Sequence, residues 1–524
     1  MGVPFSGDLM SNKYNKTLRP PILAVKFANI LFGLGLMASA LIVVYFLYDL
    51  YFLQSDDLSQ YNKDFLFRYK LVSIFFGILL IFVFTIGLKI NINKKVNYLL
   101  LIISLVTSLY IGEIFLKIYN SPYVGEYLLN KKREYNAAQE GITYDARKYI
   151  EVYEELNKRG IEVYPNVYPS FLIKSQSLFE RIDDTLQVTS NGLSTPNGKI
   201  FHLGGISDVK MFFSPEELGY YSIYKTDEHG FNNNKGLYIK DHIDILLTGD
   251  SFTEGKSVKQ ENNISGVLRK MGYRAVSLGM GGNGPLIEYA NLVEYAIPLR
   301  PKVVLWVYYE NDISDLKVEM ESSLLMRYLK DEGFTQNLIE RQDEIDHMLH
   351  QYLDQNLLAW KEKSLQRYNE SHQLFNFSAR SVFMLNKLSE RITKLIPISL
   401  DSSKISTIDL AIDNTFRDIL SKAKTTVSKW DGEFFFVFLP TFGRYVLDEK
   451  NFDEELRFRK RILSIVRKLD IPIIDIHKEV FLFHNDPESL YALRVGGHYN
   501  REGYRLVAEG IAKILSQRGS LTTN

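Results

Sequence analysis

Three long apolar runs within the first 120 residues constrain the fold of this chain more than any other feature. Residues 27–48 and 71–88 carry no charged side chain, and residues 96–112 form a third uncharged run that continues weakly past Glu113 to Leu116. A helix needs roughly 20 apolar residues to cross a bilayer. The sequence therefore predicts a three-span membrane anchor over residues 1–120. The alternative, a signal peptide followed by buried helices, fits less well because the first run is longer than a signal-peptide core.

The cations that flank these runs predict the orientation of the anchor. Basic residues precede the first run and fill the short loop between the second and third runs, namely Lys13, Lys16, Arg19, Lys26, Lys89, Lys94 and Lys95. We therefore expect a multi-pass protein of the inner or plasma membrane with a cytoplasmic N-terminus and a periplasmic or extracellular C-terminal domain. The basic run 131–133, beyond the third apolar run, favours the opposite orientation.

Composition excludes several classes of function. Lysine plus arginine and aspartate plus glutamate both number 62, so the formal net charge is zero and no basic footprint for nucleic acid is present. The chain has no cysteine, which excludes disulfides, thiolate metal sites and a cysteine nucleophile. A chain of 524 residues is also too long to fold around a single hydrophobic core, so at least two domains are expected.

Beyond residue 240 the pattern is typical of an α/β domain. Near-continuous apolar runs at residues 243–248, 275–278, 303–309, 434–439 and 471–476 alternate with amphipathic stretches such as 452–469 and 501–516. Runs of this kind indicate buried parallel strands, and their alternation with helices predicts a doubly wound sheet. Ligands of such sheets bind where the carboxyl ends of the strands meet.

Two other stretches complete the predicted domain organisation. Residues 121–240 are expected to join the anchor to the sheet, with a charged stalk helix over residues 130–158 followed by short accessory strands. Residues 241–524 are expected to form the sheet domain, and the charged, helical residues 316–400 interrupt it as an insertion or lid.

Polar residues follow the first predicted strand, in the sequence Gly249-Asp250-Ser251-Phe252-Thr253-Glu254-Gly255. A serine between a buried strand and a helix lies where backbone N–H groups converge, which suits a nucleophile whose attack creates an oxyanion. The alternative is that Ser251 only caps the following helix.

Three further loops contain residues with the same chemistry. A glycine-rich loop that includes Gly282 follows the second strand, and Asn311, a neutral amide donor, follows the third. His498 precedes the last helix, where an imidazole could act as a general base. Each of these features alone is equally typical of an ordinary loop or turn.

Taken in this order, the four residues resemble the SGNH (GDSL) hydrolase superfamily, over residues 240–315 and 405–517. The resemblance implies a flavodoxin-like five-stranded sheet, with Ser251 as nucleophile and His498 as its base. It also implies an oxyanion hole formed by the amides of Ser251 and Gly282 and the side chain of Asn311.

The sequence departs from this family at the acid that orients the histidine. The family places an aspartate two or three residues before the histidine, where this chain has Val495 and Gly496. Asp475 or Asp486 could supply the acid instead. A Ser–His dyad is the other active arrangement, because the third member of a triad mainly orients the base. A degenerate site that serves binding or assembly is the remaining alternative.

The segment 224–233 precedes the nucleophile strand and resembles one found in some membrane-bound members. Its Gly230 and Asn232 indicate a tight turn, and a hairpin that packs on the sheet is expected rather than a catalytic element.

The predicted function is that of a serine esterase or O-acyltransferase acting on cell-envelope polysaccharide, glycolipid or lipid. No cofactor is implied. No metal site is predicted, since His347 and His350 beside Asp346 fit a solvated helix face. Expected partners are the bilayer, an acylated polysaccharide or lipid substrate, and a membrane-bound O-acyltransferase or other membrane-complex subunit. The alternative is a catalytically inactive SGNH-fold subunit of a membrane complex.

Overall fold

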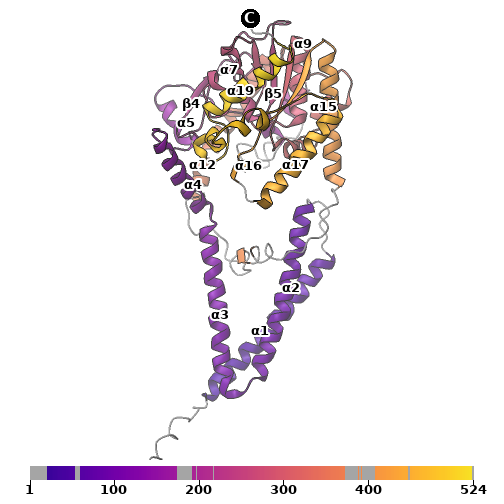
Figure 1. The fold of residues 1–524 in the computed structure, drawn as a ribbon. Coiled ribbons are helices and arrows are strands. Elements are labelled where there is room, and N and C mark those ends of the chain that lie inside the picture. The colour runs from indigo at the N-terminus through magenta and orange to yellow at the C-terminus, as the bar shows by residue number, and fades with distance from the viewer. Residues whose placement is uncertain are drawn as a thin grey trace, which may run out of the picture. The chain divides into compact units, whose positions relative to one another are not determined.

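A computed structural model describes residues 20–52, 60–173, 192–195, 198–215, 217–371, 387–388, 391, 407–446 and 449–521. These residues divide into two compact units (Figure 1). The first unit contains the described residues up to Gly125 and those between Ser371 and Ser406. The second unit contains those of Glu126–Glu370 and Thr407–Asn524.

The first unit contains three long helices, α1 (Ile22–Phe52), α2 (Gln60–Lys89) and α3 (Ile92–Tyr119). Each includes a stretch long and apolar enough to cross a membrane, as the sequence predicted. The third helix is longer than its uncharged run. Its Glu113 is fully buried and pairs with Lys117 one turn later at 3.3 Å, so the two charges partly compensate each other and the helix continues past them.

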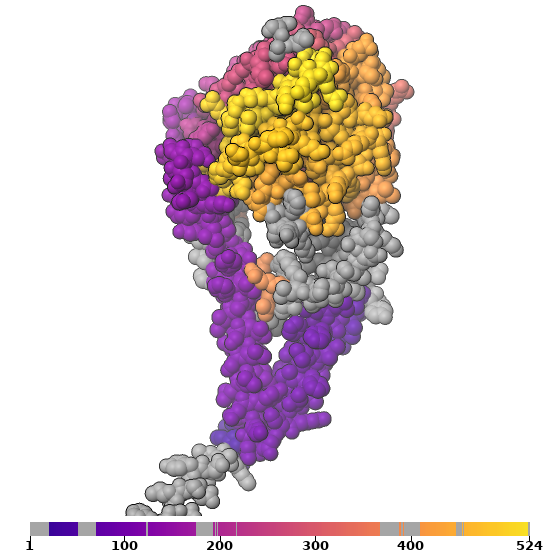
Figure 2. All heavy atoms as spheres, in the orientation of Figure 1, coloured from indigo at the N-terminus to yellow at the C-terminus, as the bar shows by residue number. Residues whose placement is uncertain are grey.

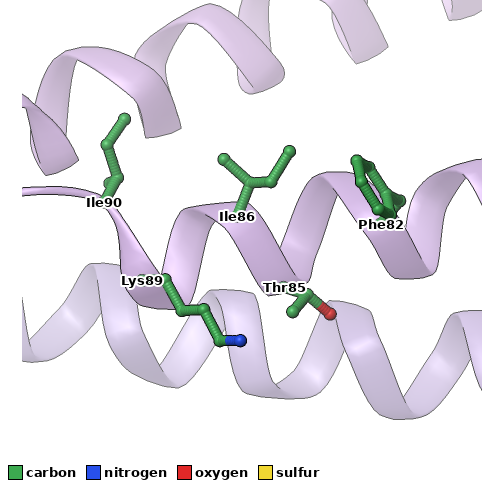
Figure 3. A pocket seen from close by; sticks show the side chains of 5 residues that line it. All are labelled: Phe82, Thr85, Ile86, Lys89 and Ile90. Carbon is green, nitrogen blue, oxygen red and sulfur yellow. The ribbon is translucent and has the colours of Figure 1, made fainter.

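Close packing holds α1 against α2. Gly35 lies against the ring of Phe84, and Gly87 lies against the ring of Phe32, so each glycine leaves space for an aromatic side chain of the other helix. A hollow beside the end of α2 is lined by Phe82, Thr85, Ile86, Lys89 and Ile90 (Figure 3).

The second unit is built on the predicted parallel sheet. Its strands are β5 (Ile245–Gly249), β6 (Ala275–Ser277), β7 (Val303–Tyr308), β8 (Glu433–Phe438) and β9 (Ile473–Asp475). They pair in the order β6-β5-β7-β8-β9, with every neighbouring pair parallel. The predicted α/β class and flavodoxin-like order are therefore confirmed.

Helices cover both faces of this sheet because successive strand residues face opposite sides. Leu246 belongs to the apolar cluster on one face, with residues of α8 (Pro285–Asn291), α15 (Thr407–Ser428) and α17 (Glu449–Lys468). Ile245 and Leu247 belong to the other cluster, with α7 (Ile264–Lys270) and α19 (Arg501–Gln517). The C-terminal part, in orange and yellow, forms a continuous surface of this unit in Figure 2.

The described helical insertion between β7 and β8 comprises α10 (Asp312–Glu319), α11 (Ser323–Lys330) and α12 (Gln342–Ser371) before α15. Leu349 and Leu353 of α12 are buried in the core of the unit. Most of the predicted insertion between 372 and 400 lies outside the described residues.

Short connecting elements are α6 (Ser251–Glu254), η2 (Gln260–Asn262), η3 (Leu292–Ala296), α9 (Ile297–Leu299), α16 (Gly443–Val446), α18 (Ile476–Glu479), η4 (Phe481–Phe483), η5 (Pro487–Leu490) and η6 (Ala492–Arg494).

The prediction of one continuous stalk helix over residues 130–158 is wrong. The structure has two helices there, α4 (Pro122–Gln139) and α5 (Tyr149–Lys158). Gly141 follows α4 with a φ of +69°, the left-handed conformation that ends helices. Accessory strands do follow, as two antiparallel pairs: β1 (Leu193–Thr195) with β2 (Gly198–Ile200), and β3 (Lys210–Phe213) with β4 (Ser222–Lys225). The remaining short element is η1 (Pro169–Leu172).

Candidate active site

Ser251 is the first residue of α6, directly beyond the carboxyl end of β5. The helix is capped by Asp250, whose carboxylate accepts a 2.9 Å hydrogen bond from the backbone N–H of Phe252. Ser251 is therefore not the cap, and its hydroxyl is available for another partner. A side chain at Gly249 would overlap Thr253 and the carbonyl of Val307, which explains why a glycine precedes this turn.

His498 is that partner. Its Nε2 lies 2.7 Å from the hydroxyl oxygen of Ser251, so the structure brings together two residues 247 positions apart in the sequence. The ring of His498 also packs against Phe252, with centroids 4.7 Å apart, and Phe252 stacks on Tyr309 at 4.0 Å. Tyr309 thus supports the ring beneath the histidine.

The opposite nitrogen of His498 meets a carboxylate that sequence analysis missed. Nδ1 lies 2.9 and 3.0 Å from the two carboxylate oxygens of Glu217, which belongs to the loop between β3 and β4. The same carboxylate accepts a 3.2 Å hydrogen bond from the backbone N–H of His498. Ser251, His498 and Glu217 thus form one hydrogen-bonded chain with the geometry of a catalytic triad.

Neither of the sequence-based candidates for the orienting acid fills this position. Asp475 forms an ion pair with Arg459, and Asp486 forms one with Arg494. In the part of the chain that the structure describes, neither carboxylate bonds to His498. Asp475 and Asp486 therefore do not lie at Nδ1 of His498 as expected, and Glu217 occupies that position instead.

The surroundings of Glu217 keep its carboxylate ionised and fixed. Burial acts to raise the pKa of Glu217, but the charge of His498 and the hydrogen bonds from it, together with the charge of Lys256, outweigh burial and hold that pKa well below its usual range. The hydroxyl of Ser257 donates a further hydrogen bond at 3.0 Å. Gly497 has a φ of +84°, and a Cβ there would stand 3.1 Å from the carboxylate carbon of Glu217.

The expected oxyanion donors lie at the ends of the neighbouring strands. Gly282, with a φ of +74°, belongs to a loop that passes so close to α6 that a side chain at Gly279 would overlap the backbone of Glu254. Asn311 follows β7, and its amide donates a 2.8 Å hydrogen bond to Asp315. This bond fixes the direction of the Asn311 amide.

Behind these loops lies a cluster of buried carboxyl groups: Asp250, Glu288, Asp312, Asp315 and Glu319. Glu319 accepts hydrogen bonds from the backbone N–H groups of Gly284 and Leu286, at 2.6 and 2.8 Å, and so holds the glycine-rich loop. Within the described parts of the chain, neither carboxyl oxygen of Glu288 has a hydrogen-bond partner. Burial raises the pKa of Asp250 to about 6 and that of Glu319 to about 8. Among the described residues no group is arranged to hold a metal ion.

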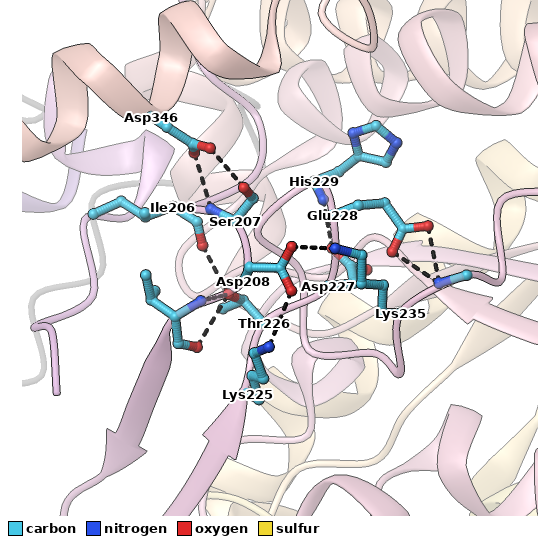
Figure 4. Close-up of polar contacts among 12 residues, drawn as sticks. Ile206, Ser207, Asp208, Lys225, Thr226, Asp227, Glu228, His229, Lys235 and Asp346 are labelled. Atoms are coloured by element: carbon cyan, nitrogen blue, oxygen red, sulfur yellow. Dashed lines mark hydrogen bonds and ion pairs between the residues drawn. The ribbon is translucent and has the colours of Figure 1, made fainter. Parts of the chain in front are cut away.

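The segment 224–233 has a structural part in this fold, as expected (Figure 4). Asp227 accepts hydrogen bonds from the backbone N–H groups of His229 and Phe231 and so closes a tight loop. Gly230 lies against the backbone of Gly205. The amide of Asn233 donates to the carbonyl of Ser277 at 2.8 Å, which attaches this loop to the edge strand β6.

The helix that carries His347 and His350, α12, packs against other residues of the stretch 121–240 that precedes the sheet. Asp346 accepts two hydrogen bonds from Ser207, at 2.9 Å from the backbone N–H and 2.6 Å from the hydroxyl (Figure 4). The ring of His350 packs edge-on against Tyr164 at 5.1 Å. Asp346 and His350 thus have packing partners in the accessory segment, whereas His347 is exposed.

Comparison with known proteins gives a distant structural likeness. No protein-family model and no curated protein matches the chain. One similar solved structure is that of a supposed lipolytic protein of the G-D-S-L family from Desulfitobacterium hafniense DCB-2, at 14% identity, covering 52% of this chain and 99% of that chain, with a TM-score of 0.28. A likeness at this level does not bear on the function of the present chain.

Proposed function

We propose that this chain is a serine-dependent acyl ester hydrolase or O-acyltransferase. The observation that carries the proposal is the continuous hydrogen-bonded chain from Ser251 through His498 to Glu217. The alternative of an inactive subunit was motivated by the missing acid before His498. The carboxylate of Glu217, which comes from another segment and contacts Nδ1 of His498, supports an active site instead.

The chemistry follows from the positions of these groups. Nε2 of His498 takes the hydroxyl proton as Ser251 attacks an ester carbonyl, and the negative charge of Glu217 stabilises the resulting imidazolium. The amides of Ser251 and Gly282 and the side chain of Asn311 would stabilise the oxyanion. The imidazolium then protonates the departing alcohol, leaving an acyl group on Ser251. Water or a sugar hydroxyl takes this acyl group and restores the serine.

The proposed substrate is an O-acylated polysaccharide or glycolipid of the cell envelope at the external face of the membrane. Three helices of membrane-spanning length and apolarity precede the second unit, which carries the proposed triad and is called the catalytic unit below. They would keep this unit near a bilayer. The cations before the first apolar run and between the second and third runs favour an external catalytic unit. The proposed partner is a membrane-bound O-acyltransferase or another membrane-complex subunit, which only the resemblance to the SGNH superfamily implies.

The direct test is labelling of the detergent-purified full chain with a fluorophosphonate, which reacts with activated serines. We expect rapid labelling of the wild type and of the control Ser428→Ala. Ser251→Ala and His498→Ala should abolish labelling, because one removes the nucleophile and the other its base. Folded wild-type protein that resists labelling would contradict the proposal. Labelled protein justifies assays of acyl release and acyl transfer on acylated envelope glycans.

The oxyanion site gives a second prediction. Asn311→Ala should lower the turnover of a nitrophenyl ester by about 10²–10³-fold, the usual effect of losing one oxyanion donor. The half-saturating ester concentration should change much less, because the bond strengthens only as the oxyanion forms. An unchanged turnover in Asn311→Ala would exclude this side chain from the oxyanion site.

A further inference from the structure

The chain that leaves the third apolar helix contacts both loops of the proposed triad. Only Asn120 and Ser121 separate α3 from α4, and the residues from Glu126 onward belong to the catalytic unit. Two positions of this stretch, Asn136 and Tyr144, contact the histidine loop and the acid loop respectively. Neither position belongs to a motif of the nucleophile, oxyanion or histidine loops.

Asn136 holds the histidine loop at its most strained point. The backbone before His498 adopts positive φ at Leu493 (46°), Arg494 (53°), Gly496 (88°) and Gly497. Left-handed backbone at a residue other than glycine costs of order 1–3 kcal/mol and persists only where the surroundings fix it. The amide of Asn136 donates a 2.7 Å hydrogen bond to the carbonyl of Leu493 and so helps to fix this conformation.

Tyr144 holds the loop that carries Glu217. Gly219, two residues after Glu217, has a φ of +72°, and a Cβ there would stand 2.8 Å from a ring carbon of Tyr144, so the ring lies directly on the loop. The next residue, Asp145, donates its backbone N–H to the carbonyl of Gly219 at 2.8 Å. The hydroxyl of Tyr144 donates to Asn130 of α4 at 3.1 Å, which ties the ring back to the helix.

We propose that Asn136 and Tyr144 are positioning residues that bring the general base and its acid into register. This inference rests on the proposed function. The two contacts act on opposite ends of the His498–Glu217 hydrogen bond, and both come from one short stretch of chain. Each residue therefore acts through the triad without touching the substrate.

The test compares three variants of the detergent-purified full chain. Asn136→Asp keeps the shape of the side chain but removes the N–H donor, and Tyr144→Leu removes the ring from Gly219. Lys132→Ala, at an exposed position of α4, is the matched control. The limiting rate of fluorophosphonate labelling and the half-saturating probe concentration are measured for each. Tryptophan fluorescence monitors folding of the catalytic unit, because all three tryptophans, at positions 306, 360 and 430, lie in it.

We expect Asn136→Asp and Tyr144→Leu to lower the limiting labelling rate roughly 10- to 100-fold, as misalignment of catalytic groups does, at an unchanged half-saturating concentration. In the Glu217→Gln background, each of these two substitutions should lower the labelling rate by a smaller factor than in the wild type. The alignment of His498 with its acid is already lost in that background. The control should label like the wild type. The two variants affect different loops. If one of them fails to fold, the other still tests whether this stretch of chain positions the triad.

The positioning roles would be overturned if the folded variants label at the wild-type rate. They would also be overturned if the rate loss of each variant multiplies fully with that of Glu217→Gln. Either result would leave the proposed function intact. Failure of the wild type itself to label would instead overturn the proposed function.

Discussion

Replacing Glu217 by glutamine is expected to lower the rate of fluorophosphonate labelling and of ester turnover by about 10²–10⁴-fold. The loss of a triad carboxylate at the same geometry has an effect near the upper end of this range. Glutamine keeps the size of the side chain but removes the charge that stabilises the imidazolium. Its amide nitrogen also cannot accept the proton of Nδ1, so His498 is held in the wrong tautomer or orientation. Labelling rates of the purified full chain measure this effect.

The matched control for Glu217→Gln is Asp486→Asn, which makes the same chemical change at one of the two acids that the sequence analysis offered for orienting His498. Asp486 pairs with Arg494 and does not bond to His498, so this variant should retain most of the activity. The opposite result, with Asp486→Asn inactive and Glu217→Gln active, would show that the histidine uses the acid expected from the sequence.

The second large effect concerns Glu288 and the pH dependence of stability. Burial, followed by the charges of Asp250 and Glu319, raises the pKa of Glu288 well above its usual range in the folded protein. In the unfolded chain the pKa of the same group is about 4.3. Above that pH the folded state binds more protons than the unfolded state, so the free energy of unfolding falls as pH rises. The loss from this group is about 1.4 kcal/mol per pH unit until the folded group ionises.

Glu288→Gln should remove this part of the pH dependence. We expect the variant and the wild type to unfold at similar temperatures near pH 5, and the variant to unfold at the higher temperature near pH 8. Tryptophan fluorescence follows the catalytic unit, and Glu261→Gln, at an exposed position, is the control. An equal slope of unfolding temperature against pH in wild type and Glu288→Gln would show that Glu288 ionises normally in the folded protein.

The sheet and the two ends of the Ser–His pair could be predicted from the sequence because each leaves a local mark. The strands β5, β7 and β8 are almost fully buried, so their apolar runs are continuous. The loops that follow them carry glycines and polar residues at the turn itself. The pairing of Ser251 with His498 rests on the resemblance to the SGNH superfamily instead, since His498 lies in a loop well beyond the last strand, β9.

Glu217 could not be predicted because nothing local distinguishes it. It lies in a short loop between two accessory strands, before the sheet begins, and its contact with His498 is formed entirely by tertiary packing. The one indication in the sequence was indirect. Val495 and Gly496 stand where the resemblance implies an aspartate, and the glycine at position 497 leaves room for the carboxylate of Glu217.

The break between α4 and α5 was missed for a different reason. Charged residues run through both helices, and this pattern is typical of one continuous exposed helix, but Gly141 separates the two. That glycine is the local stop signal. The helix after it is amphipathic, and its Val152, Tyr153 and Leu156 are buried against the catalytic unit.

The origin of the acid also sets a boundary on how this protein can be divided. A fragment that starts at residue 241 would retain every strand of the parallel sheet, the nucleophile and the base. It would lack Glu217 and the stretch that holds both catalytic loops. Such a fragment is expected to be a poor catalyst even if it folds. The proposed triad and its positioning contacts therefore predict that the smallest active piece of this chain begins no later than α4.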